Sequence, residues 1–260
     1  MTVVAPLLLL AVAMAAHATD RRPPVLRDVG IDQRLGDTVP ATVSFRDETG
    51  RAVTLGDYLG NQPVVLSLVY HSCPMLCGQT TNGLAASLKA LAFDAGRDFT
   101  VLSVSFDPRD TPESAIPRRT NALARYARPA AARGWHFLTG DAAATEALTR
   151  AVGFRWTRDP ATGEPAHVPA TILLTPDGRI SRYFYGIEPA PRDLRLGLVE
   201  ASSGRIGSAV DHLLLFCYRY DPANGRYSAA VMNAVRVGGV LTVLALGAFL
   251  GVMWRREGRG

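Results

Sequence analysis

The sequence predicts an α/β fold in which a mixed β-sheet carries helices on both faces, with a further helix in the membrane at the C-terminal end. Two continuous apolar, β-branched runs, 63–70 and 99–106, are typical of strands buried on both faces. Segments with helical spacing and capping residues follow these runs. An uncharged run of 18 residues, 237–254, approaches the length of about 20 residues that crosses a bilayer.

The body of the chain, residues 37–203, alternates between expected strands and helices. After the first buried strand, apolar residues at helical spacing predict a helix over 80–93. After the second, Thr111 and Pro112 begin a helix with a hydroxyl cap and proline in first position. The remaining expected elements are a strand at 135–138, a helix from Asp141 to Gly153, two strands joined by a turn at 176–178, and a helix at 191–202. This order is that of a thioredoxin-like domain.

The first 18 residues read as a cleaved export signal. An apolar run is followed by Ala16, His17 and Ala18, the small-x-small pattern of a signal-peptidase site. No Lys or Arg precedes the run, which leaves an uncleaved anchor as the alternative. Residues 19–36 are polar and proline-bearing, which suits an extended lead-in.

The run 237–254 is interpreted as a single transmembrane helix, with a buried core helix as the alternative. Arg255, Arg256 and Arg259 follow it, and positive flanks stay on the cytoplasmic side. Residues 255–260 are therefore the expected cytoplasmic tail, and 204–236 a juxtamembrane segment. In a bacterium the chain would sit in the inner membrane with its body in the periplasm.

Cys73 and Cys77 stand where the first buried strand ends and its helix begins. A helix N-terminus presents free N–H groups and the positive end of the dipole, so it favours thiolate over thiol. The spacing of four makes the two residues neighbours one helical turn apart. Two such sulfurs can share one metal ion, or close a disulfide if the first turn adjusts.

A two-thiolate metal site needs at least one further ligand, and histidine is the usual partner. His17 lies in the expected signal, and His136 begins a strand and is expected to be structural. His71 stands in the mouth of the cysteine loop and remains a possible ligand. His167 precedes the two hairpin strands, in a loop that faces the cysteine loop in a thioredoxin-like fold.

These residues resemble the Sco/SenC family of copper-binding, thioredoxin-like assembly proteins. The family's Cys-Pro-x-x-Cys motif is matched by Cys73 to Cys77, and its aspartate-rich loop by 105–112, which contains Asp107 and Asp110. Its metal-binding histidine stands ten residues before the aspartate of a Pro-Asp-Gly turn, the position of His167. The resemblance covers roughly residues 40–200.

The resemblance implies one copper ion held by Cys73, Cys77 and His167. It further implies delivery of that ion to cytochrome c oxidase subunit II or a similar copper protein, or reduction of that protein's cysteines. Two soft thiolates and an imidazole suit Cu(I). In an oxidising compartment the pair would also need a periplasmic thiol reductant. Asp107 and Asp110, as hard oxygen ligands, are expected to shape the loop or face a partner.

Other functions remain open at this point. A thiol–disulfide oxidoreductase without obligatory metal is the main alternative, so enzyme activity is undecided, and a helix-start thiolate can also attack peroxide. The net charge of +5 comes from scattered arginines, which argues against nucleic-acid binding. Cys217 and His212 lie five residues apart near the membrane run, and Cys217 is interpreted as an apolar packing residue.

Overall fold

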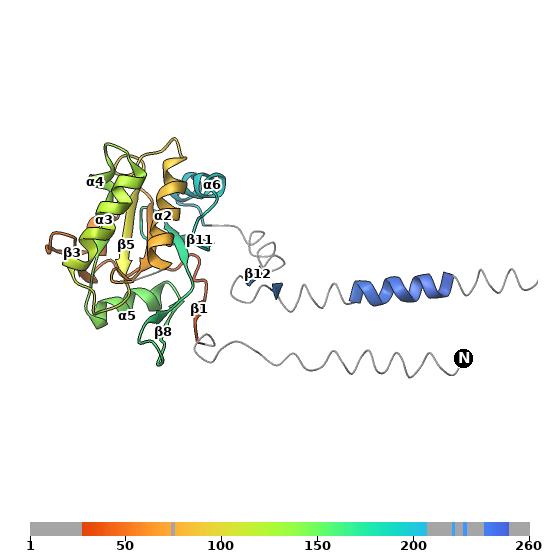
Figure 1. The fold of residues 1–260 in the computed structure, drawn as a ribbon. Coiled ribbons are helices and arrows are strands. Elements are labelled where there is room, and N and C mark those ends of the chain that lie inside the picture. The colour runs from red at the N-terminus through yellow and green to blue at the C-terminus, as the bar shows by residue number, and fades with distance from the viewer. Residues whose placement is uncertain (1–27, 74–75, 207–219, 222–225, 228–236, 250–260) are drawn as a thin grey trace, which may run out of the picture.

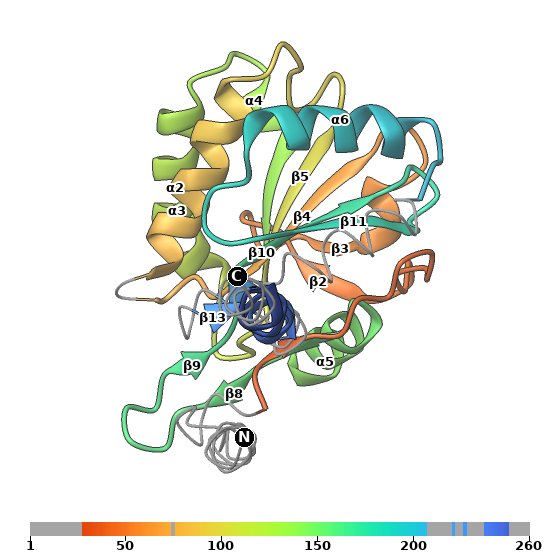
Figure 2. The ribbon, with the colours of Figure 1, turned by 90° about the vertical axis from the view of Figure 1, so that its right-hand side faces the viewer.

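The computed structural model describes residues 28–73, 76–206, 220–221, 226–227 and 237–249. Its centre is a five-stranded sheet in the order β11-β10-β4-β5-β6 (Figures 1 and 2). The strands are β4 (Val64–Val69), β5 (Thr100–Ser105), β6 (Trp135–Leu138), β10 (Ala170–Leu174) and β11 (Ile180–Tyr185). Strands β4, β5 and β6 are parallel, whereas β10 is antiparallel to β4 and β11 is antiparallel to β10. The mixed sheet predicted from the sequence is confirmed.

Alternate residues of the sheet belong to two separate apolar cores, because successive side chains of a strand point to opposite faces. Val65 packs in one core and Leu66 in the other. The first core also contains residues of α2 (Leu76–Lys89), α3 (Pro112–Tyr126) and α6 (Pro191–Ser202). The second contains residues of α5 (Ala142–Ala151) and of the N-terminal segments. Helices therefore cover both faces (Figure 2).

Three helix boundaries follow from the caps that the sequence predicts. Thr111 is the N-cap of α3 and forms a capping box with Ser114. The Asp141 side chain accepts a hydrogen bond from the Ala144 N–H at the start of α5. Gly153 ends this segment at φ +65°, where a Cβ would lie 1.8 Å from the Asp32 carbonyl oxygen. Only glycine fits there.

The helix after the cysteines differs from the prediction. It begins at Leu76, four residues before the predicted start, and ends at Lys89 rather than at residue 93. Cys73 therefore precedes the helix, so the two cysteines are not neighbours on successive helical turns as the spacing predicted. The helical spacing of Leu84 and Leu88 is confirmed, since both are fully buried.

Short elements complete the described fold. They are β1 (Gly30–Ile31), β2 (Ser44–Arg46), β3 (Ala52–Thr54), η2 (Leu55–Tyr58), α4 (Ala131–Gly134), β7 (Phe154–Arg155), β8 (Thr157–Arg158), β9 (Pro165–Ala166), β12 (Tyr220–Asp221) and β13 (Arg226–Tyr227). The strand β1 pairs with β7, so part of the expected lead-in is joined to the domain. The hairpins β2–β3 and β8–β9 were not predicted.

Residues 237–249, the described part of the expected transmembrane run, form a helix whose residues are all exposed. In the part of the chain that the structure describes, no helix is long enough and apolar enough to span a bilayer. Residues 250–254 of the predicted run, the expected signal 1–18, the tail 255–260, and Cys217 and His212 lie outside the described residues.

Candidate metal centre

The cysteine loop and His167 lie at the same edge of the sheet. The loop follows β4, and His167 lies shortly before β10, which runs antiparallel to β4. The pairing of Thr171 with Ser67 places the beginning of β10 beside the end of β4. The cysteine loop and the segment that leads into β10 are far apart along the chain but thus meet beyond the carboxyl end of β4, where polar sites usually form in α/β folds.

Cys73 is held in the apolar interior. It is only 3% exposed and belongs to the same core as Tyr70 and Phe106. Cys77 is the second residue of α2, where free N–H groups favour a thiolate. Its side chain lies outside the described residues, as do Pro74 and Met75.

Asp110 fixes the backbone of the cysteine loop. Its buried carboxylate accepts hydrogen bonds from the backbone N–H groups of His71 and Ser72, the second at 3.0 Å. The Ser105 hydroxyl donates to the same carboxylate at 2.6 Å. A carboxylate offers several lone pairs, so one side chain can satisfy several buried donors. The structure thus gives Asp110 the loop-shaping role, one of the two alternatives expected from the sequence.

Arg118 of α3 holds the same loop through its carbonyl groups. Its Nε donates to the His71 carbonyl oxygen at 2.8 Å, and its Nη2 donates to the Cys73 carbonyl oxygen. Gly78 in the first turn of α2 leaves room for the guanidinium, since a Cβ there would lie 2.9 Å from Nη1. The sequence did not predict the role of Arg118, because the contact of this side chain with the loop depends on how α3 crosses the loop.

His167 is surrounded by aromatic rings. Its ring centroid lies 4.9 Å from that of Phe106, 6.0 Å from that of Tyr70 and 6.0 Å from that of Phe154. Burial lowers the pKa of His167, and a backbone hydrogen bond at Val168 opposes this only in part. The ring is therefore neutral near pH 7, which is the form that binds metals.

Cys73 and His167 are connected through one apolar core. Tyr70 and Phe106 pack in the core that contains Cys73, and both contact the His167 ring. Among the described residues, no three His, Cys, Asp or Glu side chains form a group that could hold a metal ion. Because the Cys77 side chain is outside this set, the three-ligand site of Cys73, Cys77 and His167 stays a prediction.

The other described histidines have structural surroundings. His71 is buried, its Nε2 lies 3.1 Å from the Leu138 carbonyl oxygen, and its ring lies near Phe137. Burial lowers the pKa of His71, so this ring is also neutral. The Nε2 of His136 lies 3.2 Å from the Arg133 carbonyl oxygen, and its ring packs on Tyr58. The structural role predicted for His136 is confirmed.

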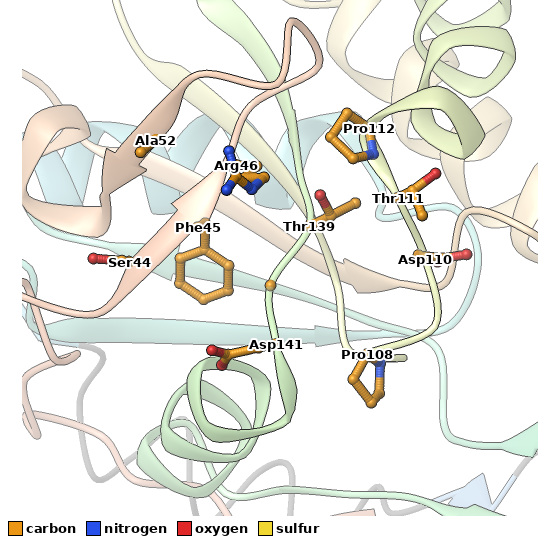
Figure 3. Close-up of a pocket in the computed structure, with 11 residues that line it drawn as sticks. Ser44, Phe45, Arg46, Ala52, Pro108, Asp110, Thr111, Pro112, Thr139 and Asp141 are labelled. Carbon is orange, nitrogen blue, oxygen red and sulfur yellow. The ribbon is translucent and has the colours of Figure 1, made fainter.

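Asp110 is also one of the residues that line a cavity of about 520 Å³ (Figure 3). It is bounded by the β2–β3 hairpin, the loop between β5 and α3, and the start of α5. Phe45, Pro108 and Asp141 are among its lining residues, whereas Cys73 and His167 are not. The cavity is therefore separate from Cys73 and His167.

Comparison with known proteins agrees with this geometry. A family model described as SCO1/SenC matches residues 32–195, which is more than half of the chain. The chain belongs to this family. No curated protein sequence matches it. The SCO1/SenC match spans the whole central sheet, the cysteine loop and His167.

Solved structures share the SCO1/SenC fold. A proposed electron transfer protein from Aquifex aeolicus is 26% identical, with a TM-score of 0.57 over 65% of this chain and 95% of that chain. ScoI from Arabidopsis thaliana, solved with copper bound, is 19% identical, with a TM-score of 0.52 over 66% of this chain and 99% of its own. BsSco, described as a Sco-family cytochrome c oxidase assembly protein with a disulfide switch, is 20% identical, with a TM-score of 0.52 over 66% and 98%.

Proposed function

We propose that this chain is a membrane-anchored copper carrier that binds one copper ion through Cys73, Cys77 and His167. The observation that carries the proposal is that His167 and the cysteine loop meet at one edge of the sheet, where the His167 ring packs on Tyr70 and Phe106 of the apolar core that also contains Cys73. The family membership supports the same ligand set.

The chemistry of these groups suits Cu(I). Two thiolates are soft ligands, and a neutral imidazole completes a set that this soft cation accepts. Burial keeps His167 neutral, and the helix N-terminus at Cys77 favours the thiolate. The apolar surroundings of Cys73 and His167 limit access of water and oxidants to the site.

We propose the copper centre of cytochrome c oxidase subunit II as the recipient of the ion. The proposal rests on family membership and on the oxidase assembly role stated for BsSco. The same thiolates would need a periplasmic thiol reductant before loading, because oxidation to a disulfide removes both sulfur ligands.

The proposed location is a bacterial inner membrane, with residues 37–203 in the periplasm. Residues 1–18 would direct export, and 237–254 would form the anchor. The described part of that run supports the anchor, since Val243 is 71% and Phe249 62% exposed among the described residues. A row of exposed aliphatic side chains on a helix is stable in lipid and costly in water.

A thiol–disulfide oxidoreductase is the second candidate, favoured by the position of Cys77 in the first turn of α2. In that reaction the two thiols would close one S–S bond and release two protons. The two electrons would reduce a disulfide of a partner protein to two thiols. Metal would not be required.

Anaerobic titration of the reduced full-length chain in detergent with Cu(I) separates the two functions. We expect one tightly bound ion per chain. His167→Ala should keep a reducible Cys73–Cys77 bond but lose stable copper, whereas Cys73→Ser or Cys77→Ser should lose both. His136→Ala is the matched control and should bind copper normally. Full copper stoichiometry in His167→Ala would refute the ligand assignment and leave the oxidoreductase.

A further inference from the structure

The β8–β9 hairpin carries His167 at its end, one residue after Ala166. Besides the aromatic packing of His167 and Trp156, side-chain hydrogen bonds join this hairpin to the rest of the domain. Arg158 donates from Nη2 to the Asp107 carboxylate at 3.2 Å. The Tyr70 hydroxyl donates to the Glu164 carboxylate at 3.2 Å. The position of His167 therefore depends on a short hairpin and on the contacts that hold this hairpin against the domain.

Arg158 makes contacts within the hairpin as well as outside it. Its Nη1 donates to the Gly163 carbonyl oxygen at 2.8 Å, which closes the hairpin turn. Its guanidinium carbon lies 5.7 Å from the ring centroid of Trp156. A planar guanidinium can serve two acceptors and an aromatic face at once, which an ammonium cannot do equally well. Arg158 thus links a closed hairpin to Asp107.

Asp107 is fully buried and has a second cationic partner. Arg109 contacts it through Nε at 3.0 Å and Nη2 at 2.7 Å. Arg109 belongs to the same loop as Asp107, so the hydrogen bonds between these two residues do not connect the loop to another part of the domain. Glu164 adds only a charge attraction to Arg109. The two arginines therefore share the task of neutralising Asp107, but only Arg158 links it by hydrogen bonds to the hairpin.

The Asp107 loop also contacts the two halves of the metal site. Phe106, directly before Asp107, packs on the His167 ring. Asp110, three residues after it, holds the N–H groups of the cysteine loop. A hairpin fixed to Asp107 is thereby fixed to the segment that positions the cysteines.

We propose that Arg158 is a positioning residue for the copper site, because it ties the hairpin to Asp107 and so keeps His167 beside the cysteine loop. The inference rests on the proposed copper-carrier function. It predicts that loss of Arg158 weakens copper binding through His167, although Arg158 is no ligand. Changes of residues that orient a metal ligand typically cost about 10- to 100-fold in affinity.

The test compares Arg158→Gln with Arg109→Gln in the full-length chain in detergent. Each change removes one cation from Asp107, but only the first removes a hydrogen bond between Asp107 and the hairpin. In Cu(I) competition titrations with a chromogenic chelator, we expect about tenfold weaker binding for Arg158→Gln. The Cu(I) affinity of Arg109→Gln should stay close to that of the wild-type protein. Equal affinities for the two variants would overturn the inference.

A double-mutant cycle with His167→Ala separates positioning from general damage. If Arg158 acts through His167, then Arg158→Gln should not weaken the residual copper binding of His167→Ala any further. A loss of similar size in both backgrounds would contradict the role, because it would mean that Arg158 affects the domain and not the histidine.

Hydrogen exchange without metal gives an independent readout. The Asp159 N–H donates to Glu164 and the Gly163 N–H donates to Asp159 within the hairpin. These amides should exchange faster in Arg158→Gln than in Arg109→Gln. Equal exchange rates in the two variants would show that Arg158 does not hold the hairpin in place. If the unchanged protein itself failed to bind copper, the copper-carrier proposal would fail, while exchange would still report on the tether.

Discussion

The cysteine loop is fixed through its backbone, whereas His167 is fixed through side chains. Asp110 and Arg118 bind N–H and carbonyl groups of residues 71–73 from two neighbouring elements. The His167 ring packs on aromatic rings, and its hairpin is joined to the body by Arg158 and Glu164. The cysteine loop is thus held by several hydrogen bonds to one short stretch of backbone, whereas single hydrogen bonds from Arg158 and to Glu164 join the hairpin to the body.

The difference suggests which half of the site can move. A carrier must hold its ion and also release it to a partner. Loss of one hairpin contact would loosen the segment that carries the histidine without unfolding the sheet, whereas loss of Asp110 would leave the buried His71 N–H without its acceptor. We therefore expect the cysteine half to be rigid and the histidine half to be the side from which copper leaves.

The largest effect is expected from Asp110→Ala. It removes the acceptor of the His71 and Ser72 N–H groups and of the Ser105 hydroxyl, and leaving a buried donor such as those of His71 and Ser105 unsatisfied costs about 1–3 kcal/mol each. We expect a loss of about 3 kcal/mol in the free energy of unfolding, measured by urea denaturation, and faster amide exchange at these two residues. Asp110→Asn, which keeps one acceptor oxygen, should lose less. A loss below about 1 kcal/mol would show that the loop does not depend on this carboxylate.

A smaller effect is expected from Arg118→Met, which removes the donors to the carbonyl groups of His71 and Cys73. The Cys73 thiol should be alkylated about tenfold faster, equivalent to about 1.4 kcal/mol of easier local opening. Mass spectrometry of the reduced, metal-free chain can follow Cys73 separately from the other cysteines. Arg119→Met is the matched control, because Arg119 pairs with Glu48 and not with the loop. Equal alkylation rates of Cys73 in both variants would show that Arg118 does not hold the cysteine loop more than Arg119 does.

The smallest effect concerns Asp107 in acid. Burial opposes ionisation of its carboxylate, but hydrogen bonds from Arg109 and Arg158 outweigh burial and lower its pKa. A group with a lowered folded-state pKa stabilises the protein above its unfolded pKa of about 3.9 and loses this contribution as the pH falls further. Unfolding free energies measured between about pH 5 and 2 should fall less steeply for Asp107→Asn. An identical pH dependence would argue against the ion pairs.

Much of the fold could be predicted because its strongest signals are local. The runs at 63–70 and 99–106 are continuous and apolar because β4 and β5 are covered on both faces, and Asp141 caps α5 where the sequence places it. The β8–β9 hairpin has strands of two residues, too short to show a period. Asp159, Pro160 and Gly163 were the signal that could have predicted its turn.

The site was less predictable, because it depends on contacts between distant segments. The sequence suggested Cys73, Cys77 and His167 through spacing and resemblance. It could not reveal that Arg118 reaches the loop from α3, or that Arg158 reaches Asp107 across 51 positions. Such contacts follow from how helices and hairpins cross the end of the sheet. They leave no periodic pattern along the chain.

The central claim is most directly tested by X-ray absorption at the copper edge of the Cu(I)-loaded full-length chain. The account predicts two sulfur ligands and one imidazole nitrogen in the unchanged protein, and loss of the imidazole signal in His167→Ala with both sulfurs retained in any copper that remains. An imidazole signal that persists in His167→Ala, or a site with sulfur ligands alone in the unchanged protein, would contradict it.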